Sequence, residues 1–216
     1  MTQPTPSPSK AAPRRSPGET REVLMEAAFG LVRRQGLAAT SVDEICAAAG
    51  VSKGAFFHHF KSKDELAAAA GYHWSAVTEP FFETAPYHAP DDPLARVLGY
   101  IDLRGEMMAG EIAEFTCFAG TMVQEAWATS PAVRAAAWDS MSRHADALVA
   151  DIEAAKVSRG VELDARGLAL HMVAVVQGAF ILAKASGDAA LGAASTAHLR
   201  RYVELLFAAP GKLNDA

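Results

Sequence analysis

The sequence predicts an all-α fold in which a small three-helix N-terminal domain precedes a larger C-terminal helical domain. Three observations lead to this prediction. Apolar residues recur at helical spacing, whereas the alternating pattern of strands is scarce. Capping residues precede several apolar stretches, and Gly or Pro separates one stretch from the next. The chain has 216 residues, of which 50% are hydrophobic and 21% charged, so it can bury a substantial core.

The first helix is expected over about residues 18–35. Leu24, Leu31 and Val32 have the spacing of one buried helix face, and Gly36 supplies a stop at the C-terminal end.

Two short helices joined by a turn should follow. Ser41 and Glu44 can form a capping box that opens a helix ending near Ala49. Gly50 breaks the pattern, and a third helix runs from about residue 53 to 60. Two short helices joined in this way form a helix-turn-helix, whose second helix enters the major groove of DNA.

The rest of the chain predicts longer helices. Ser62 caps a fourth helix that runs towards Trp74. After a connection rich in Pro and Asp, helices are expected near residues 94–109, 112–128, 132–158, 164–186 and 188–207. We therefore divide the chain into a helix-turn-helix domain over residues 18–66 and a helical domain over residues 67–208.

Charge is unevenly distributed along the chain. The net charge is −5. Residues 1–66 hold nine Lys or Arg and seven Asp or Glu, a balance of +2, which leaves −7 for the remainder. A polyanion should therefore dock at the N-terminal end.

The termini, the cysteines and the longest apolar run bear on location. Residues 1–17 mix Pro, Ser, Thr and basic residues without the apolar core of a secretory signal, so a disordered tail is expected there, with another tail over residues 209–216. The apolar run from His171 to Ala185 falls short of the roughly 20 residues of a membrane span. Cys46 and Cys117 are too few for a disulfide framework and fit a reducing cytoplasm. These features predict a cytoplasmic protein without a membrane partner.

One segment resembles a known family. Thr40-Ser41-Val42 through VSKGAFFHHFKSKDEL is similar to the DNA-binding signature of TetR/AcrR family bacterial repressors, and the likeness spans about residues 20–66. The helical remainder resembles the variable ligand-binding domain of that family in architecture alone. The resemblance implies a homodimeric transcriptional regulator that binds a palindromic double-stranded DNA operator. It also implies release of that operator when a small apolar or aromatic effector binds.

The resemblance also implies a set of DNA contacts. Thr40 and Lys63 would hold phosphates, and the recognition helix would carry Ser52, Lys53, Gly54, Ala55, Phe57, His58 and His59. Phe57 departs from the family pattern, which commonly has a Tyr whose hydroxyl contacts a phosphate. Phe57 can offer only apolar contact with a sugar or a thymine methyl. Adjacent His58 and His59 point about 100° apart on a helix, so they do not form a metal site.

The larger domain should hold the effector and the dimer contacts. Candidate ligand-binding residues are Phe81, Cys117, Met122, Trp127, Met141, His171 and Gln177, although such side chains equally often form plain core. Apolar faces on the last two helices are expected to pack across a two-fold axis as a four-helix bundle. Those faces carry His171, Val175, Phe180, Ile181, Leu182, Leu199, Tyr202, Leu205 and Leu206.

Other classes of protein fit less well. The motif patterns GxSxG, GxGxxG and the P-loop are missing, as is a metal-ligand cluster, so neither enzymatic activity nor a cofactor is expected. The main alternative is a helical protein that binds small molecules or partners but not DNA, for which Phe57 is the suggestive departure. Repression and activation both remain compatible with the sequence.

Overall fold

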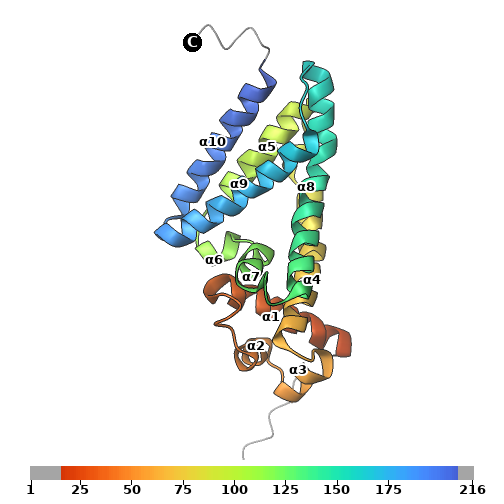
Figure 1. The fold of residues 1–216 in the computed structure, drawn as a ribbon, viewed down its shortest axis with the longest axis vertical. Helices are drawn as coiled ribbons and strands as arrows, with labels where there is room; N and C mark the ends of the chain where they lie inside the picture. The colour runs from red at the N-terminus through yellow and green to blue at the C-terminus, as the bar shows by residue number, and fades with distance from the viewer. Residues whose placement is uncertain (1–15, 209–216) are drawn as a thin grey trace, which may run out of the picture.

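The structure is a computed structural model, and it describes residues 16–208 (Figure 1). Within that range every regular element is a helix and none is a strand, which confirms the predicted all-α fold. In chain order the elements are α1 (Pro17–Gln35), α2 (Val42–Ala49), α3 (Lys53–His59), α4 (Lys63–Glu83), the 3-10 helix η1 (Pro86–His88), α5 (Pro93–Glu106), α6 (Ile112–Phe115), α7 (Phe118–Ala126), α8 (Pro131–Arg159), α9 (Ala165–Ser186) and α10 (Ala189–Phe207).

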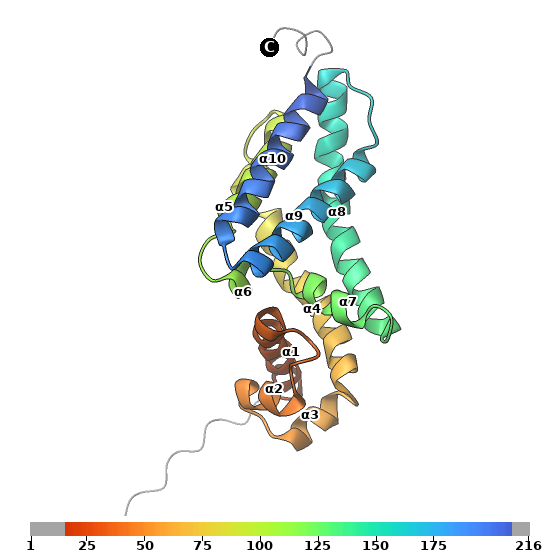
Figure 2. The same cartoon turned by 60° about the vertical axis from the view of Figure 1, so that its left-hand side comes forward.

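Two groups of helices lie at opposite ends of an elongated molecule. α1, α2 and α3 pack together at one end, and α5, α8, α9 and α10 form the body of the other (Figures 1 and 2). α4 runs from the first group into the second, where it packs along α8, while α6 and α7 lie against α1. The expected domain boundary after residue 66 falls inside α4, so the two groups share this helix.

α1 begins earlier than the sequence suggested. The Ser16 hydroxyl accepts from the Glu19 backbone N–H while the Glu19 carboxylate accepts from the Ser16 N–H, and Pro17 is the first helical residue. Ser16 and Pro17 therefore belong to the helix and not to the expected N-terminal tail. The rest of that tail, residues 1–15, and the expected tail over residues 209–216 lie outside the described residues.

α4 runs past its expected end near Trp74 and reaches Glu83. α4 packs closely against α7 and α8, because a Cβ placed at Gly71 would lie 2.6 Å from the Met122 Cε and 2.9 Å from the Ala136 Cβ. Tertiary packing of this kind stabilises helices more than intrinsic propensity does. The same packing carries α4 from the helix-turn-helix end into the body of the molecule.

The prediction of a single helix over residues 112–128 is wrong, because the chain forms two helices there, α6 and α7. Thr116 and Cys117 between them have extended backbone conformations. The Cys117 Sγ accepts from the Gly120 backbone N–H at 3.3 Å and so caps α7. A thiol is not among the residue types that mark a helix start, which is why the pattern of apolar residues gave no sign of the break.

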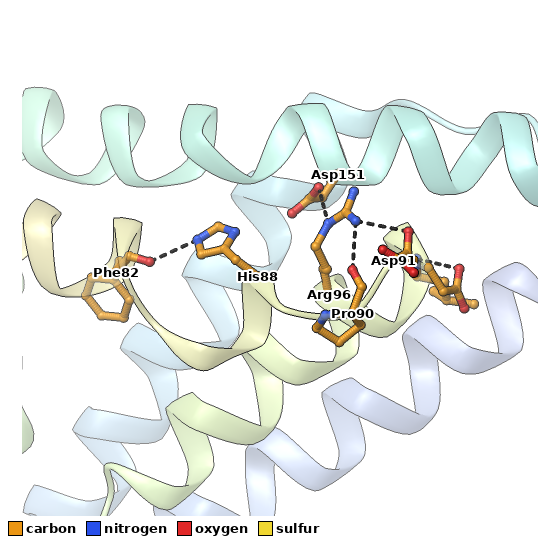
Figure 3. Close-up of polar contacts among 8 residues, drawn as sticks. Phe82, His88, Pro90, Asp91, Arg96 and Asp151 are labelled. Atoms are coloured by element: carbon orange, nitrogen blue, oxygen red, sulfur yellow. Dashed lines mark hydrogen bonds and ion pairs between the residues drawn. The ribbon is translucent and has the colours of Figure 1, made fainter.

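The connection between α4 and α5 is held against the body of the molecule, as Figure 3 shows. The His88 Nε2 lies 3.0 Å from the Phe82 carbonyl oxygen at the end of α4. The Arg96 Nε donates to the Asp151 carboxylate on α8 at 2.8 Å, and its Nη1 donates to the Pro90 carbonyl at 2.9 Å. The His88 contact ties the connection to the end of α4, at the residue whose ring lines the cavity described below, and the Arg96 bonds tie the connection to α8.

Among the described residues, α9 is the one helix whose length and composition would allow it to cross a membrane. The expected apolar run was shorter than this helix, which has 22 residues. In the structure 44% of its most apolar 18-residue segment is buried, and the helix packs against α8 and α10. Cys46 and Cys117 are both free, so no disulfide joins described residues.

Candidate nucleic-acid interface and effector cavity

An apolar cluster holds the helix-turn-helix together. Phe56 and Phe60 are completely or almost completely buried, and their ring centroids lie 5.9 Å apart. They pack with the buried Leu24 of α1 and Ile45 of α2. The Gly50 backbone between α2 and α3 is left-handed, with φ of 65°, which a glycine adopts without steric cost. The short α3 therefore depends on its buried face for its position.

The opposite face of α3 points outward. Ser52, Lys53, Gly54, Phe57 and His58 are exposed, and the Ser52 hydroxyl caps the helix by accepting from the Ala55 N–H at 3.2 Å. Phe57 is 51% exposed although it is aromatic. Ala55 and His59 are half-buried. The residues expected to face DNA bases thus form one accessible surface, apart from these two partly covered positions.

Lys53 is paired with an acidic neighbour on this surface. Its Nζ lies 2.9 Å from the Asp43 carboxylate on α2, and both side chains are more than half exposed. Exposed pairs of this kind contribute at most about 1 kcal/mol. Lys53 can therefore exchange Asp43 for a phosphate or a base edge at little cost.

Thr40 and Lys63, which are expected to hold phosphates, bond to backbone carbonyls of their own chain in this structure. Thr40 is fully buried, and its hydroxyl donates to the Gly36 carbonyl at 2.6 Å. The Lys63 Nζ donates to the carbonyls of Leu37 at 2.6 Å and Thr40 at 2.8 Å, with a longer bond to Ala38 at 3.3 Å. Their contacts satisfy the backbone carbonyls between α1 and α2, because an ammonium group has three donors to give. In this structure both side chains brace the domain.

We expect Lys63→Met to destabilise the helix-turn-helix by about 1–2 kcal/mol, because it removes charge-assisted bonds from partly buried carbonyls. Chemical denaturation followed by circular dichroism measures the change. Lys61→Met, at an exposed lysine two positions earlier, is the matched control and should leave stability unchanged. A Lys63 variant that keeps full stability but loses DNA affinity would contradict this bracing role and support the expected phosphate contact.

The part of the N-terminal region that the structure describes is not basic. Three of the nine basic residues counted there, Lys10, Arg14 and Arg15, lie outside the described residues. Residues 16–66 hold six Lys or Arg and seven Asp or Glu, a net charge of −1. The expected excess of +2 therefore comes from the part of the chain before α1.

A cavity of about 230 Å³ lies in the larger group of helices. Its wall is formed by the second half of α4 together with α5, α6, α8 and α9 and the residue before α7. Of the residues expected to bind a ligand, Phe81, Cys117, Met141 and Gln177 line it. Five Phe or Trp side chains and three Met or Cys side chains line the wall, which suits an apolar or aromatic molecule.

The remaining three candidates lie elsewhere. Met122 is fully buried in the core between α4, α7 and α8, and Trp127 is 60% exposed at the end of α7. His171 is exposed on α9, where its ring lies 5.3 Å from that of Tyr202 on α10. The sequence shows which residues are large and apolar, and helical spacing predicts which of them share a helix face. It does not show which face lines the cavity.

The cavity wall also carries polar and charged side chains. Arg104 and His144 both line it, and the His144 Nε2 lies 2.7 Å from the hydroxyl of the buried Tyr100. Burial, together with the nearby Arg104 charge, lowers the pKa of His144 to about 3 from its ordinary value of 6.5. The imidazole is therefore neutral at physiological pH. No sequence pattern marked Arg104, since one arginine in a polar-rich helix is normally solvated.

The buried imidazole predicts a pH dependence of stability. The unfolded chain takes up a proton on His144 near its ordinary pKa of 6.5, whereas the folded chain does not until about pH 3. Stability should therefore fall as pH drops below 6.5, by about 2 kcal/mol from this group at about pH 5. His144→Gln should flatten the slope of the unfolding free energy between pH 7 and 5, as measured by urea denaturation. His198→Gln, at an exposed histidine of α10, should not; equal slopes in wild type and His144→Gln would contradict the assignment.

The two groups of helices touch beside the cavity. The Arg33 Nη1 on α1 donates to the Glu114 carbonyl on α6 at 2.8 Å, and its Cζ lies 5.1 Å from the centre of the Trp74 ring. Phe29 of α1 also meets Trp74, with ring centroids 5.1 Å apart. Trp74 and Glu114 both line the cavity. The cavity wall is thus in direct contact with the first helix of the helix-turn-helix.

An apolar surface remains uncovered on α9 and α10. Ile181, Leu182, Tyr202 and Leu205 are each 45–47% exposed. Phe180 and Leu199 were also expected at a dimer contact, but they are buried within the chain and cannot contact a second protomer. The sequence pattern could not separate the inner from the outer apolar face of these helices.

These features define a helix-turn-helix protein whose second helical part encloses a small-molecule-sized cavity. Two family models match the chain: "Bacterial regulatory proteins, tetR family" over residues 24–70, and "Tetracyclin repressor-like, C-terminal domain" over residues 93–199. The chain belongs to the TetR family of bacterial transcriptional regulators and carries its DNA-binding helix-turn-helix.

Individual relatives agree with this assignment. The HTH-type transcriptional regulator AcrR of Shigella flexneri is 46% identical over 48 residues, which are 22% of each chain. Transcriptional regulator AcuR of Cereibacter sphaeroides is 28% identical over 131 residues, 60% of each chain. The matches therefore span less than two thirds of these relatives. A solved TetR family regulator from Agrobacterium tumefaciens shares the fold, with a TM-score of 0.74 and 24% identity over 89% of this chain and all of that one.

Proposed function

We propose that the protein is a homodimeric repressor that binds a palindromic operator and releases it when a small apolar or aromatic molecule occupies the cavity. The observation that carries the proposal is the physical link between cavity and helix-turn-helix through α4, which lines the cavity at Trp74 and begins at Lys63 beside α3.

DNA contact would use the outward face of α3. That face presents Lys53, Phe57 and His58 to solvent, with the Gly54 backbone between them. A lysine can donate to guanine or to a phosphate, and a glycine allows the backbone to approach closely. One such domain contacts too few base pairs for selectivity, so a two-fold dimer that reads two half-sites about 34 Å apart supports specific binding.

Release would follow from movement of the cavity wall. A bound molecule must make room for itself among Trp74, Phe81 and Phe115, which come from α4 and α6. Trp74 touches Phe29 of α1, and α6 is bonded to Arg33 of α1, so either shift reaches the helix-turn-helix. The effector shifts the population between two arrangements only to the extent that it binds one of them better.

The test is selection of bound duplexes from a random DNA pool, followed by a gel shift with the enriched site. We expect an inverted repeat, a steep fall in affinity with salt, and release by a small-molecule extract of bacterial cells. Lys53→Ala should weaken binding, whereas Lys156→Ala on α8, another lysine with an acidic partner, should not. If no extract alters the affinity for the operator, the proposed release by a small molecule is contradicted.

A helical protein that binds a small molecule but no DNA is the second candidate. Phe57 favours it, because an exposed phenyl ring on α3 lacks the hydroxyl that could bind a phosphate. No enriched duplex, and no binding even at low salt, would favour this candidate over the repressor.

A further inference from the structure

Arg104 has an unusual environment for a charged side chain. It lies on α5 with its guanidinium between two aromatic rings, its Cζ 5.1 Å from the centre of Phe82 and 5.4 Å from that of Phe180. Its Nε is buried and has no hydrogen-bond partner. Stacking on aromatic faces stabilises a guanidinium, but it supplies no acceptor for the N–H groups that lie in the plane of that group. A buried donor without an acceptor costs free energy.

No described carboxylate pairs with Arg104. Arg96, Arg143, Arg159, Arg166 and Arg200 each have an acidic partner in residues 16–208, but Arg104 has none. Two glutamates share its cavity wall. Both carboxylate oxygens of Glu79 accept hydrogen bonds from the Arg143 guanidinium, at 2.8 and 2.7 Å. Glu114 is exposed.

The rest of the cavity restricts what could neutralise this charge. Arg104 is the only Lys or Arg among the described residues of the wall, so one negative charge is sufficient. Trp74, Phe81 and Phe115 on the same cavity wall call for an apolar body. The buried Ser75 hydroxyl, which also lines the cavity, has no hydrogen-bond partner and offers a further polar contact.

From the unpaired Arg104 in an apolar cavity, we infer that the effector is a small aromatic or aliphatic monocarboxylate whose carboxylate binds the Arg104 guanidinium. This inference rests on the proposed function for the site and names its ligand class. A carboxylate matches the planar fork of a guanidinium with two parallel hydrogen bonds, which gives orientation as well as affinity. The apolar end of the molecule would then lie against α4 and α6, both of which contact α1.

The experiment uses the full-length protein without DNA and three matched pairs of probes: hexanoate, benzoate and phenylacetate, each beside its amide. Calorimetric titration and thermal denaturation measure binding. At least one acid should bind and raise the melting temperature, while its amide binds about 30-fold or more weakly, since an amide keeps the shape but loses the charge. Binding of amides as tightly as acids, or of none of the three acids at millimolar concentration, overturns the inference.

Variants locate the contact. Arg104→Gln should weaken the acid about 30-fold or more and leave the amide unchanged, whereas Arg104→Lys, which keeps charge but loses the planar fork, should fall between. Arg166→Gln, at an exposed arginine paired with Asp146, is the control and should bind as wild type does. If Arg104→Gln does not fold by circular dichroism, the Arg104→Lys variant and the acid–amide comparison still decide the question.

Failure of this inference can be told apart from failure of the proposed function. The gel shift with the enriched operator is run with the same probes and with the extract. If a neutral fraction of the extract releases the operator while no acid binds, the repressor stands and the carboxylate falls. If an acid binds through Arg104 but the protein binds no DNA, the carboxylate inference stands and the repressor proposal fails.

Discussion

Phe56→Ala should destabilise the helix-turn-helix by about 3–5 kcal/mol and abolish operator binding. The Phe56 ring is fully buried in the middle of α3 and packs on the ring of Phe60. Its removal leaves a cavity under a helix of only seven residues, which cannot be stable without that packing. Urea denaturation followed by circular dichroism measures the first effect, and a gel shift measures the second.

The neighbouring residue supplies the control for this prediction. Phe57 is of the same residue type on the same helix, but it is 51% exposed. Phe57→Ala should change stability by less than about 0.5 kcal/mol, because an exposed substitution leaves no cavity. Any loss of operator affinity in Phe57→Ala then reports a DNA contact. Equal destabilisation by the two variants would show that α3 is not oriented as described.

The second large effect is expected at the surface of α9 and α10. A double variant, Leu182→Glu with Leu205→Glu, places one charge on each helix within the exposed apolar surface. If that surface joins two protomers, burying two unpaired charges should convert the dimer to a monomer. Operator affinity should then fall about 100-fold or more, because two linked half-site contacts become one. Analytical ultracentrifugation gives the mass, and the gel shift gives the affinity.

Val157→Glu is the control for this surface effect. Val157 is 83% exposed on α8 and is not part of the apolar surface on α9 and α10, so the charge there should alter neither mass nor affinity. A double variant that remains dimeric and binds DNA as wild type does would place the dimer contact on another surface.

The local elements of the helix-turn-helix were accessible from the sequence. The Ser41 and Glu44 capping box, the Gly50 turn and the Ser52 cap all act within a few residues, and each is present in the structure. The buried positions of Phe56 and Phe60 follow from the same short-range spacing. Interactions between neighbours along the chain need no knowledge of the rest of the molecule.

The candidate ligand residues show where such reasoning ends. Cys117 was named from its apolar surroundings, but its role as a helix cap, which divides α6 from α7, was not visible in any pattern. Trp127 was predicted on the same grounds as Phe81, as a large aromatic side chain of the larger domain, yet it lies outside the cavity. Helical periodicity gives the faces of one helix and does not say which other helix each face meets.

The sequence by itself determined the all-α class, the order of the helices and the helix-turn-helix, because caps, turns and periodicity are local properties of the chain. Only the tertiary structure decided that Lys63 bonds to backbone carbonyls and that Arg104 lies between two phenyl rings without a carboxylate partner among the described residues. It also decided that α4 connects the cavity to α3. Each of these depends on groups brought together from distant parts of the chain. Their positions follow from how helices pack against one another, and one helix's sequence does not encode its neighbours.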